Sequence, residues 1–280
     1  MENERPKYKL ARPEYKGAME SCCTAFDEEL LKIPHYIKHP EMLPFVGKSY
    51  RGMGKKILLV GESHYIGEAD ASNGEKHFEE VKWYDDDGFS HAEGFKEGNS
   101  FFDCFNFYVT RHVVATFING ENGRGYSMFY HPLLAYFGKT NEVKSELHRF
   151  AFMNYFQSPA FARGKSKDPS EKDLEVAKAT LKEVIGVLRP DVVVFLSTNA
   201  FRAYIGSEKY EDEKTAEHRF LYCKKDGDEP DFYGVVHPTC RWWNNRAGMY
   251  GRVAFKHIMD MLWGQYDSLP SIEKSGKTQK

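Results

Sequence analysis

The chain has 280 residues and a formal net charge of −2, with 41% hydrophobic and 29% charged residues. These values are typical of a globular protein that can bury a substantial core, and they exclude a strongly basic protein that coats nucleic acid through its overall charge. No apolar run is long enough to cross a bilayer, and the N-terminus shows no secretory signal. We therefore expect a cytoplasmic protein that does not enter membranes.

Cysteine usage bears on the redox compartment and on metal binding. The five cysteines are scattered, and no Cys-x-x-Cys pair occurs. An odd, scattered set favours reduced thiols over a disulfide framework, and it gives no support to a zinc or iron–sulfur site. The sequence predicts neither a metal nor a cofactor.

The N-terminal part of the chain leads to a short apolar run. Residues 1–18 are polar and interrupted by prolines, which predicts a loosely attached arm. The apolar spacing from Cys22 to Ile33 predicts a helix that Pro34 ends. Residues 40–54 contain Pro40, Pro44 and three glycines, and this composition predicts a loop.

The run Ile57 to Val60 consists of four apolar residues that stop at Gly61. Such a run without alternation is typical of a strand buried on both faces of a parallel sheet. Ligands bind just beyond the carboxyl ends of such strands. The residues that follow, Glu62 to Tyr65, are thus placed where a ligand is expected.

The middle of the chain is the least regular. Residues 66–100 are rich in glycine and carry an acidic run, which predicts a functional lid or a disordered insert. The aromatic-rich residues 101–117 predict a helix over the site. A second apolar segment, 126–137, is interrupted at Pro132.

The last part of the chain alternates between strands and helices. Strands are expected at 150–156, 191–196, 220–223 and 232–236, and helices at 168–188, 200–205 and 247–263. Asp168 is expected to cap the first of these helices, with Pro169 at its first position. The charged residues 207–217 predict a loop, and the polar, lysine-rich tail from Ser268 onward predicts disorder. This alternation predicts one α/β domain.

Polar residues recur where these strands end. Glu62 to Tyr65 follow the first, Asn154 lies near the end of the second, and His237 to Thr239 follow the last. A fourth set, Ser197 to Asn199, is typical of a helix cap. Parallel strands bring their carboxyl ends to one edge of a sheet, so we expect these side chains to share one crevice.

The ordered motifs resemble those of the uracil-DNA glycosylase superfamily. The resemblance rests on the blocks Gly-Glu-Ser-His-Tyr (61–65), Phe-Met-Asn-Tyr-Phe (152–156), Pro-Asp-Val-Val-Val-Phe-Leu-Ser-Thr-Asn-Ala (190–200) and Val-Val-His-Pro-Thr (235–239). It implies a three-layer α/β/α sandwich with a central, mainly parallel four-stranded sheet. That domain would span residues 54–266, after an N-terminal arm and helical extension (1–53) and before a disordered tail (267–280).

The resemblance also implies an activity, hydrolysis of the N-glycosidic bond of a flipped, deaminated base during DNA repair. Asn154 would read the edge of the base, and His237 would stabilise the leaving anion. Glu62 or Ser63 would hold the attacking water.

Further positions follow from the same resemblance. Gly61, His64 and Tyr65 would complete the base-binding pocket. Thr239 would contact the phosphate backbone, and Arg241 and Trp242 would contact DNA beside it. The implied partner is DNA, including single-stranded DNA, or a nucleotide, and we expect a monomer.

Three other hypotheses remain, because Ser63 stands where the resembled family carries aspartate or asparagine. The protein could bind a nucleotide or a single strand without cleaving it. It could be a small-molecule hydrolase with Ser63 as nucleophile and His64 or His237 as base, although the Gly-x-Ser-x-Gly motif is absent. Metal-assisted chemistry through Glu62, His64 and His237 is the third hypothesis.

Overall fold

A computed structural model describes residues 21–64, 84, 109–120, 126–139, 142–158, 160, 168–214, 219–225, 227–244 and 251–264. Several expectations lie outside the described residues. These are the N-terminal arm 1–18, Tyr65, the insert 66–100 apart from Tyr84, residues 101–108 and the tail 267–280.

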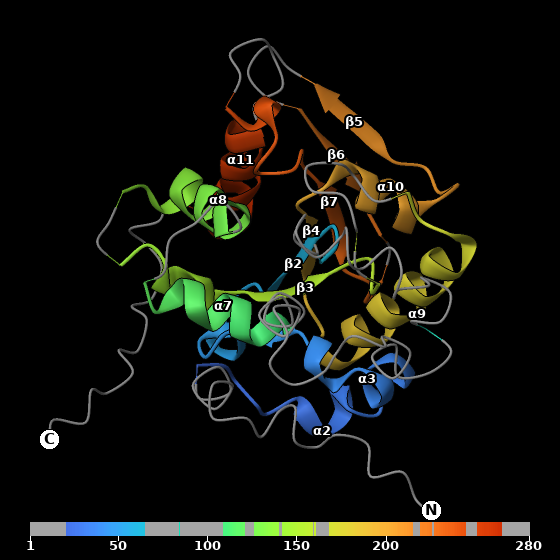
Figure 1. Cartoon of the computed structure of the whole chain (residues 1–280). Coiled ribbons are helices and arrows are strands. Elements are labelled where there is room, and N and C mark those ends of the chain that lie inside the picture. Colours follow the sequence, from blue (N-terminus) through green and yellow to red (C-terminus); the bar gives the residue numbers. More distant parts are fainter. Residues whose placement is uncertain are drawn as a thin grey trace, which may run out of the picture.

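The described chain forms one seven-stranded sheet with the strand order β1-β3-β2-β4-β7-β6-β5 (Figure 1). The strands are β1 (Phe45–Val46), β2 (Ile57–Gly61), β3 (Ala151–Asn154), β4 (Val192–Phe195), β5 (Glu211–Lys214), β6 (Arg219–Cys223) and β7 (Asp231–Gly234). Neighbours within the series β3-β2-β4-β7 are parallel, whereas β1, β6 and β5 pair antiparallel at the two sides. The four parallel strands therefore end at the same edge.

The predicted α/β class is confirmed, but the sheet is larger than the four strands expected. Two strands, β1 and β5, lie in segments that were expected to be loops. Strand β1 has only two residues, too few to show a pattern in the sequence. All four residues of β5 are exposed and charged, so the hydrophobic alternation that identifies a strand is absent from it.

Helices cover both faces of the sheet. They are α2 (Asp27–Leu30), α3 (Pro34–Lys38), α7 (Thr110–Ile118), α8 (Ser127–Phe137), α9 (Glu171–Leu188), α10 (Thr198–Ile205) and α11 (Gly251–Trp263). Short 3-10 turns lie at Pro40–Met42 (η2), Tyr50–Gly52 (η3), Ser145–Arg149 (η5) and Arg241–Trp243 (η6).

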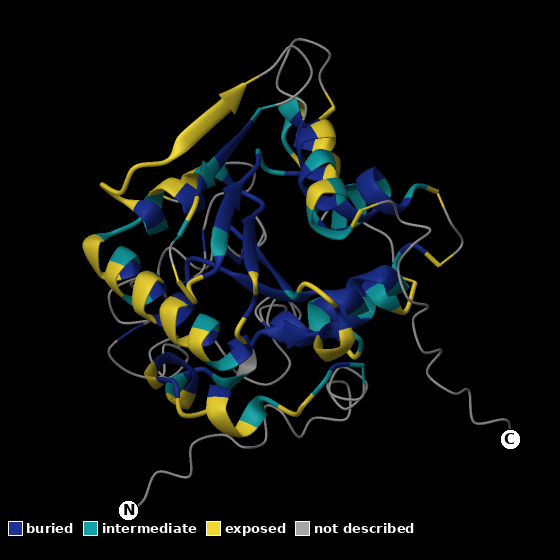
Figure 2. Ribbon diagram, turned by 180° about the vertical axis from the view of Figure 1, so that it is seen from behind, coloured by how far each residue is buried: buried dark blue, intermediate teal, exposed yellow. Residues whose placement is uncertain are grey.

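Strand β2 divides the interior into two cores. Leu58 and Val60 join a cluster with residues of α2, α3, α9 and α10, and Ile57 and Leu59 join a cluster with residues of α7, α8 and α11. Figure 2 shows the central strands buried between helices whose outer sides are exposed, whereas β5 is exposed. A fully apolar strand is thus required at this position, because both of its faces lie in a core.

Three helix boundaries differ from the sequence expectation. Pro34 does not end a helix that starts at Cys22; it is the first residue of α3, where its missing N–H costs nothing. Pro132 lies inside the continuous helix α8. The cap of α9 is Ser170 in place of Asp168, because Ser170 and Asp173 bond reciprocally as a capping box.

Asp173 also ties α9 to the segment after β3. It is fully buried and accepts hydrogen bonds from Ser158 Oγ at 2.6 Å and from Ser170 Oγ at 3.0 Å. The hydroxyl of Tyr84 donates to the same carboxylate. With the backbone N–H of Ser170, which donates at 3.1 Å, these hydroxyl groups satisfy a charge that would otherwise be costly to bury.

A buried arginine connects the N-terminal segment to α7. Arg111 is 2% exposed, and its two terminal nitrogens donate to the carboxylate of Asp27 at 2.7 and 2.8 Å. Its Nε donates to the carbonyl of Pro44 at 2.9 Å. A bidentate pair with a third bond compensates much of the cost of burying the guanidinium.

None of the helices in the described ranges is both long and apolar enough to cross a membrane.

We predict that Gly47→Ala destabilises the fold. A Cβ at this position would lie 2.0 Å from the backbone oxygen of His148, and a backbone atom cannot move away as a flexible side chain can. We expect a loss of about 3 kcal/mol in the free energy of unfolding in urea. Gly52→Ala is the matched control, since a Cβ there meets nothing within 4 Å. Equal stability of the two variants would contradict the prediction.

A second prediction concerns acid stability. Burial, together with nearby Lys48, lowers the pKa of His148 to about 4, below its ordinary value of 6.5. His148 therefore binds a proton more readily in the unfolded chain than in the folded protein. The contribution of the neutral His148 to the free energy of unfolding is complete above pH 6.5 and is lost as the pH falls toward 4. It amounts to about 3 kcal/mol at most. In His148→Phe, whose ring can still face Phe45, the unfolding free energy should fall less steeply over this range. Parallel pH profiles for the two proteins would refute the assignment.

Candidate functional site at the carboxyl edge of the parallel strands

The four parallel strands bring most of the predicted site residues to one edge of the sheet. Gly61 and Asn154 pair directly across β2 and β3. Beyond β2 the ladder continues, because Phe156 N–H donates to the carbonyl of Glu62 at 2.9 Å. On the other side, Val235 N–H donates to Phe195 of β4, which places His237 shortly past the end of β7.

Glu62 is a buried carboxylate that bonds to Ser197, the residue that caps α10 just after β4. It is 3% exposed and accepts a hydrogen bond of 2.6 Å from Ser197 Oγ. The same hydroxyl accepts from Ala200 N–H and caps α10. The first turn of α10 therefore lies close to the carboxylate.

Asn154 depends on Gly61 for its place. A Cβ on Gly61 would lie 2.3 Å from Asn154 Oδ1 and 2.7 Å from the terminal methyl of Met128 on α8. Only glycine leaves room for the amide. Asn154 is 7% exposed, and its Oδ1 has no hydrogen-bond partner among the described residues. Such a buried acceptor can take a donor from a ligand.

Ser63 is buried in the same stretch, and its Oγ likewise has no hydrogen-bond partner in the part of the chain that the structure describes. A nucleophilic serine requires a base within hydrogen-bond reach. Neither His64 nor His237 bonds to Ser63 Oγ in this structure, so the geometry does not support the serine-hydrolase hypothesis.

His237 is partly buried, and a contact within its own turn defines which of its two ring nitrogens carries the proton. Its Nδ1 accepts from Thr239 N–H at 3.3 Å and lies 2.8 Å from Thr239 Oγ1. The neutral ring therefore carries its proton on Nε2, which can donate. Burial lowers the pKa of His237, and the negative charge of Glu62 opposes this only in part. The imidazole is thus neutral at pH 7.

Helix α8 supports this turn from behind. His131 Nδ1 donates to the carbonyl of Pro238 at 2.7 Å. This residue was not singled out from the sequence, because a lone histidine in an apolar segment carries no recognisable signal. Ser197 was recognised only as a helix cap, and its bond to Glu62 was not foreseen.

Two predicted contact residues lie in η6, just beyond Thr239. The guanidinium of Arg241 lies over the ring of Trp242, 4.5 Å from its centroid. Arg241 is exposed and Trp242 half-buried, whereas the next residue, Trp243, belongs to the core. The turn thus presents a stacked cation and ring to solvent while Trp243 anchors it.

His64, which directly follows Ser63, is also buried. It is 5% exposed and lies close enough to the buried His35 of α3 to lower the pKa of that residue, although burial of His35 and nearby His39 contribute more. Tyr65, the fourth expected base-binding residue, lies outside the described residues. In the described ranges, no group of three or more histidine, cysteine or carboxylate side chains is arranged to hold a metal.

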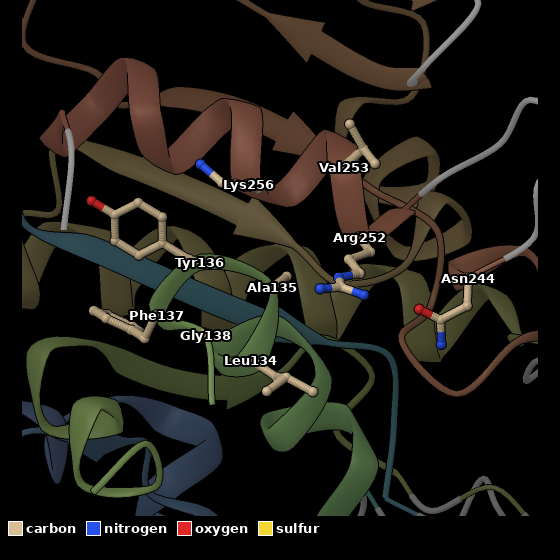
Figure 3. Close-up of a pocket in the computed structure, with 9 residues that line it drawn as sticks. All are labelled: Leu134, Ala135, Tyr136, Phe137, Gly138, Asn244, Arg252, Val253 and Lys256. Carbon is tan, nitrogen blue, oxygen red and sulfur yellow. The ribbon is translucent and has the colours of Figure 1, made fainter. Parts of the chain in front are cut away.

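Two cavities in the described part of the chain are lined by residues other than those at the strand ends. One, of about 570 Å³, lies between the last turns of α8 and the first half of α11, with Arg252 and Lys256 reaching over it (Figure 3). The other has a similar volume and is lined by residues of α2, η3 and the end of α9. None of the strand-end residues lines either cavity.

No protein-family model matches the chain, and no curated protein matches it in sequence.

We predict that Ser197 and Glu62 are energetically coupled. Ser197→Ala removes the cap of α10 and leaves a buried carboxylate without this donor, which should cost about 2–3 kcal/mol in the free energy of unfolding. Glu62→Gln removes the charge. In the double variant the loss should therefore be smaller than the sum of the two single losses.

The measurement is a double-mutant cycle by urea unfolding. We expect a coupling of about 1.5 kcal/mol or more, as is typical of hydrogen bonds to charged groups. Strictly additive losses would show that the hydroxyl acts only as a helix cap.

Proposed function

We propose that the strand-end site binds a nucleic-acid base and hydrolyses its N-glycosidic bond. The proposal rests on one observation above all, the buried Oδ1 of Asn154, which has no partner and lies against Gly61. An amide at this position can bond to both the donor and the acceptor of a pyrimidine edge. The resemblance of the motif blocks and the four neighbouring parallel strands also support it.

The width of the edge suits such a ligand. Asn154 ends β3, and His237 follows β7, three strand positions away in the order β3-β2-β4-β7. At about 4.8 Å per position, their backbones are roughly 14 Å apart. Glu62 follows β2, the strand next to β3, and so lies between these two positions.

Each group then has a defined task. Neutral His237 would donate from Nε2 to the base oxygen that gains negative charge as the bond breaks. The Glu62 carboxylate would stabilise the oxocarbenium-like sugar and orient a water molecule for attack. The unpaired hydroxyl of Ser63 would bond to that water without serving as its base.

The turn after His237 would contact the strand that carries the base. Thr239 is exposed, and its hydroxyl would bond to a phosphate oxygen by turning away from His237 Nδ1, which would keep the bond from the Thr239 backbone N–H. The pair of Arg241 and Trp242 offers a cation and an aromatic face, which together suit an unstacked base or single strand.

The test is release of free uracil from single- and double-stranded oligonucleotides by the purified protein. His237→Phe should lower the rate by about 10²–10³, the usual cost of removing one oxyanion donor. His257→Phe is the matched control, because His257 lies on α11 beside Phe220 and away from the edge. Asn154→Ala should weaken both binding and cleavage. The absence of release with any deaminated base would refute the catalytic proposal.

A second candidate is a protein that binds a nucleotide or single strand without cleaving it. The lack of any hydrogen bond to Ser63 Oγ favours it, since nothing activates this hydroxyl. Salt-sensitive binding of oligonucleotides that Asn154→Ala abolishes, without base release, would establish this candidate. Absence of binding at low salt would remove both.

A further inference from the structure

The second cavity lies at the opposite edge of the sheet from the candidate site. It has a volume of about 570 Å³ and lies between α2, η3 and the last turn of α9. Three cationic side chains line it, those of Arg51, Lys56 and Arg189. Lys56 immediately precedes β2, whereas Glu62 immediately follows it, so the two sites are separated by the strand length, roughly 17 Å for five residues.

The positive charges are not balanced within the described part of the chain. The side chains of Arg51, Lys56 and Arg189 take part in no hydrogen bond or ion pair there. Glu29 is the one acidic residue that lines the cavity, and it pairs with Lys32 at 2.5 Å. The carbonyl end of α9 adds about half a negative charge. Asp191, whose carboxylate accepts from the backbone N–H of Lys56 at 2.7 Å, adds one further negative charge beside the cavity, so a smaller excess of positive charge remains.

Arg189 occupies a backbone conformation that does not suit it. It caps the C-terminus of α9 with φ 46° and ψ 58°, in the left-handed region. Among the described residues it is the one non-glycine residue with a positive φ. Glycine or asparagine is usual at this position. An arginine kept there at an energetic cost indicates that its side chain is needed, and this observation is independent of the charge count.

We propose that this cavity binds a phosphorylated small molecule of nucleotide size. Two guanidinium groups and an ammonium group match phosphate oxygens in both charge and hydrogen-bond geometry. The half-buried side chains of Phe26 and Val187 provide an apolar wall for an uncharged ring of the ligand. The volume lies within the range usual for ligand pockets.

This site is independent of the proposed base site. It shares no residue with the strand-end edge, and ligand binding there requires no cleavage of a glycosidic bond. A negative result in the glycosylase assay therefore leaves it unaffected, and the converse also holds.

The test is calorimetric titration of the full chain with ADP and with inorganic pyrophosphate at low ionic strength. We expect ADP to bind and pyrophosphate to compete with it. Arg189→Gly should weaken ADP binding about tenfold or more, the usual effect of losing a charge-assisted hydrogen bond. The same substitution relieves the left-handed backbone, so the melting temperature should not fall.

Two further variants complete the design. Arg189→Asn also tolerates the left-handed conformation and lacks the charge, so it should match Arg189→Gly. Lys182→Gln is the matched control, because it removes an exposed cation from the same helix outside the cavity; its affinity for ADP should equal that of the wild type.

Three outcomes would overturn the proposal. One is the absence of binding of either probe at millimolar concentration. Another is unchanged ADP affinity in Arg189→Gly. The third is binding of an abasic single-stranded oligonucleotide that Arg189→Gly weakens while ADP does not bind, which would assign the cavity to a nucleic-acid backbone.

Discussion

Strand β2 is enclosed on both faces and paired along both edges, and this constraint decides where polar chemistry can occur. Its side chains fill two cores, and its backbone bonds to β3 and β4. A charged residue within it would lose hydration without gaining a partner. Polar groups can therefore begin only after Gly61. Glu62 is tolerated there because Ser197 and the first turn of α10 face it.

At the end of β3 and just after it, one buried polar group is fully hydrogen-bonded and another has no partner among the described residues. Ser158 and Asp173 bond to one another, and with Tyr84 and Ser170 they form a satisfied network that fixes the start of α9. Asn154 Oδ1 has no partner. An unsatisfied buried acceptor costs about 1–3 kcal/mol. The network explains how the fold is held together, whereas the cost at Asn154 is understandable if a ligand supplies the missing donor.

The sequence was most informative where burial imposes a pattern. The apolar runs of β2 and β4 predicted a parallel sheet, and the strand ends predicted that Glu62 and Asn154 would meet at one edge. Exposed β5 and two-residue β1 gave no such pattern. The cap of α9 was misplaced because Asp168 and Ser170 both satisfy the local rule, and only the folded geometry selects Ser170. Long-range partners cannot be predicted from one sequence, because nothing local specifies them.

Arg111 links stretches of the chain that are far apart in sequence. Its guanidinium bonds to both carboxylate oxygens of Asp27 and to the carbonyl of Pro44, so α7 is tied to a segment that precedes the first long strand. A version starting after Asp27 would leave a buried cation without its counter-ion, at a cost of about 3–5 kcal/mol. That is a large fraction of the stability of an ordinary domain.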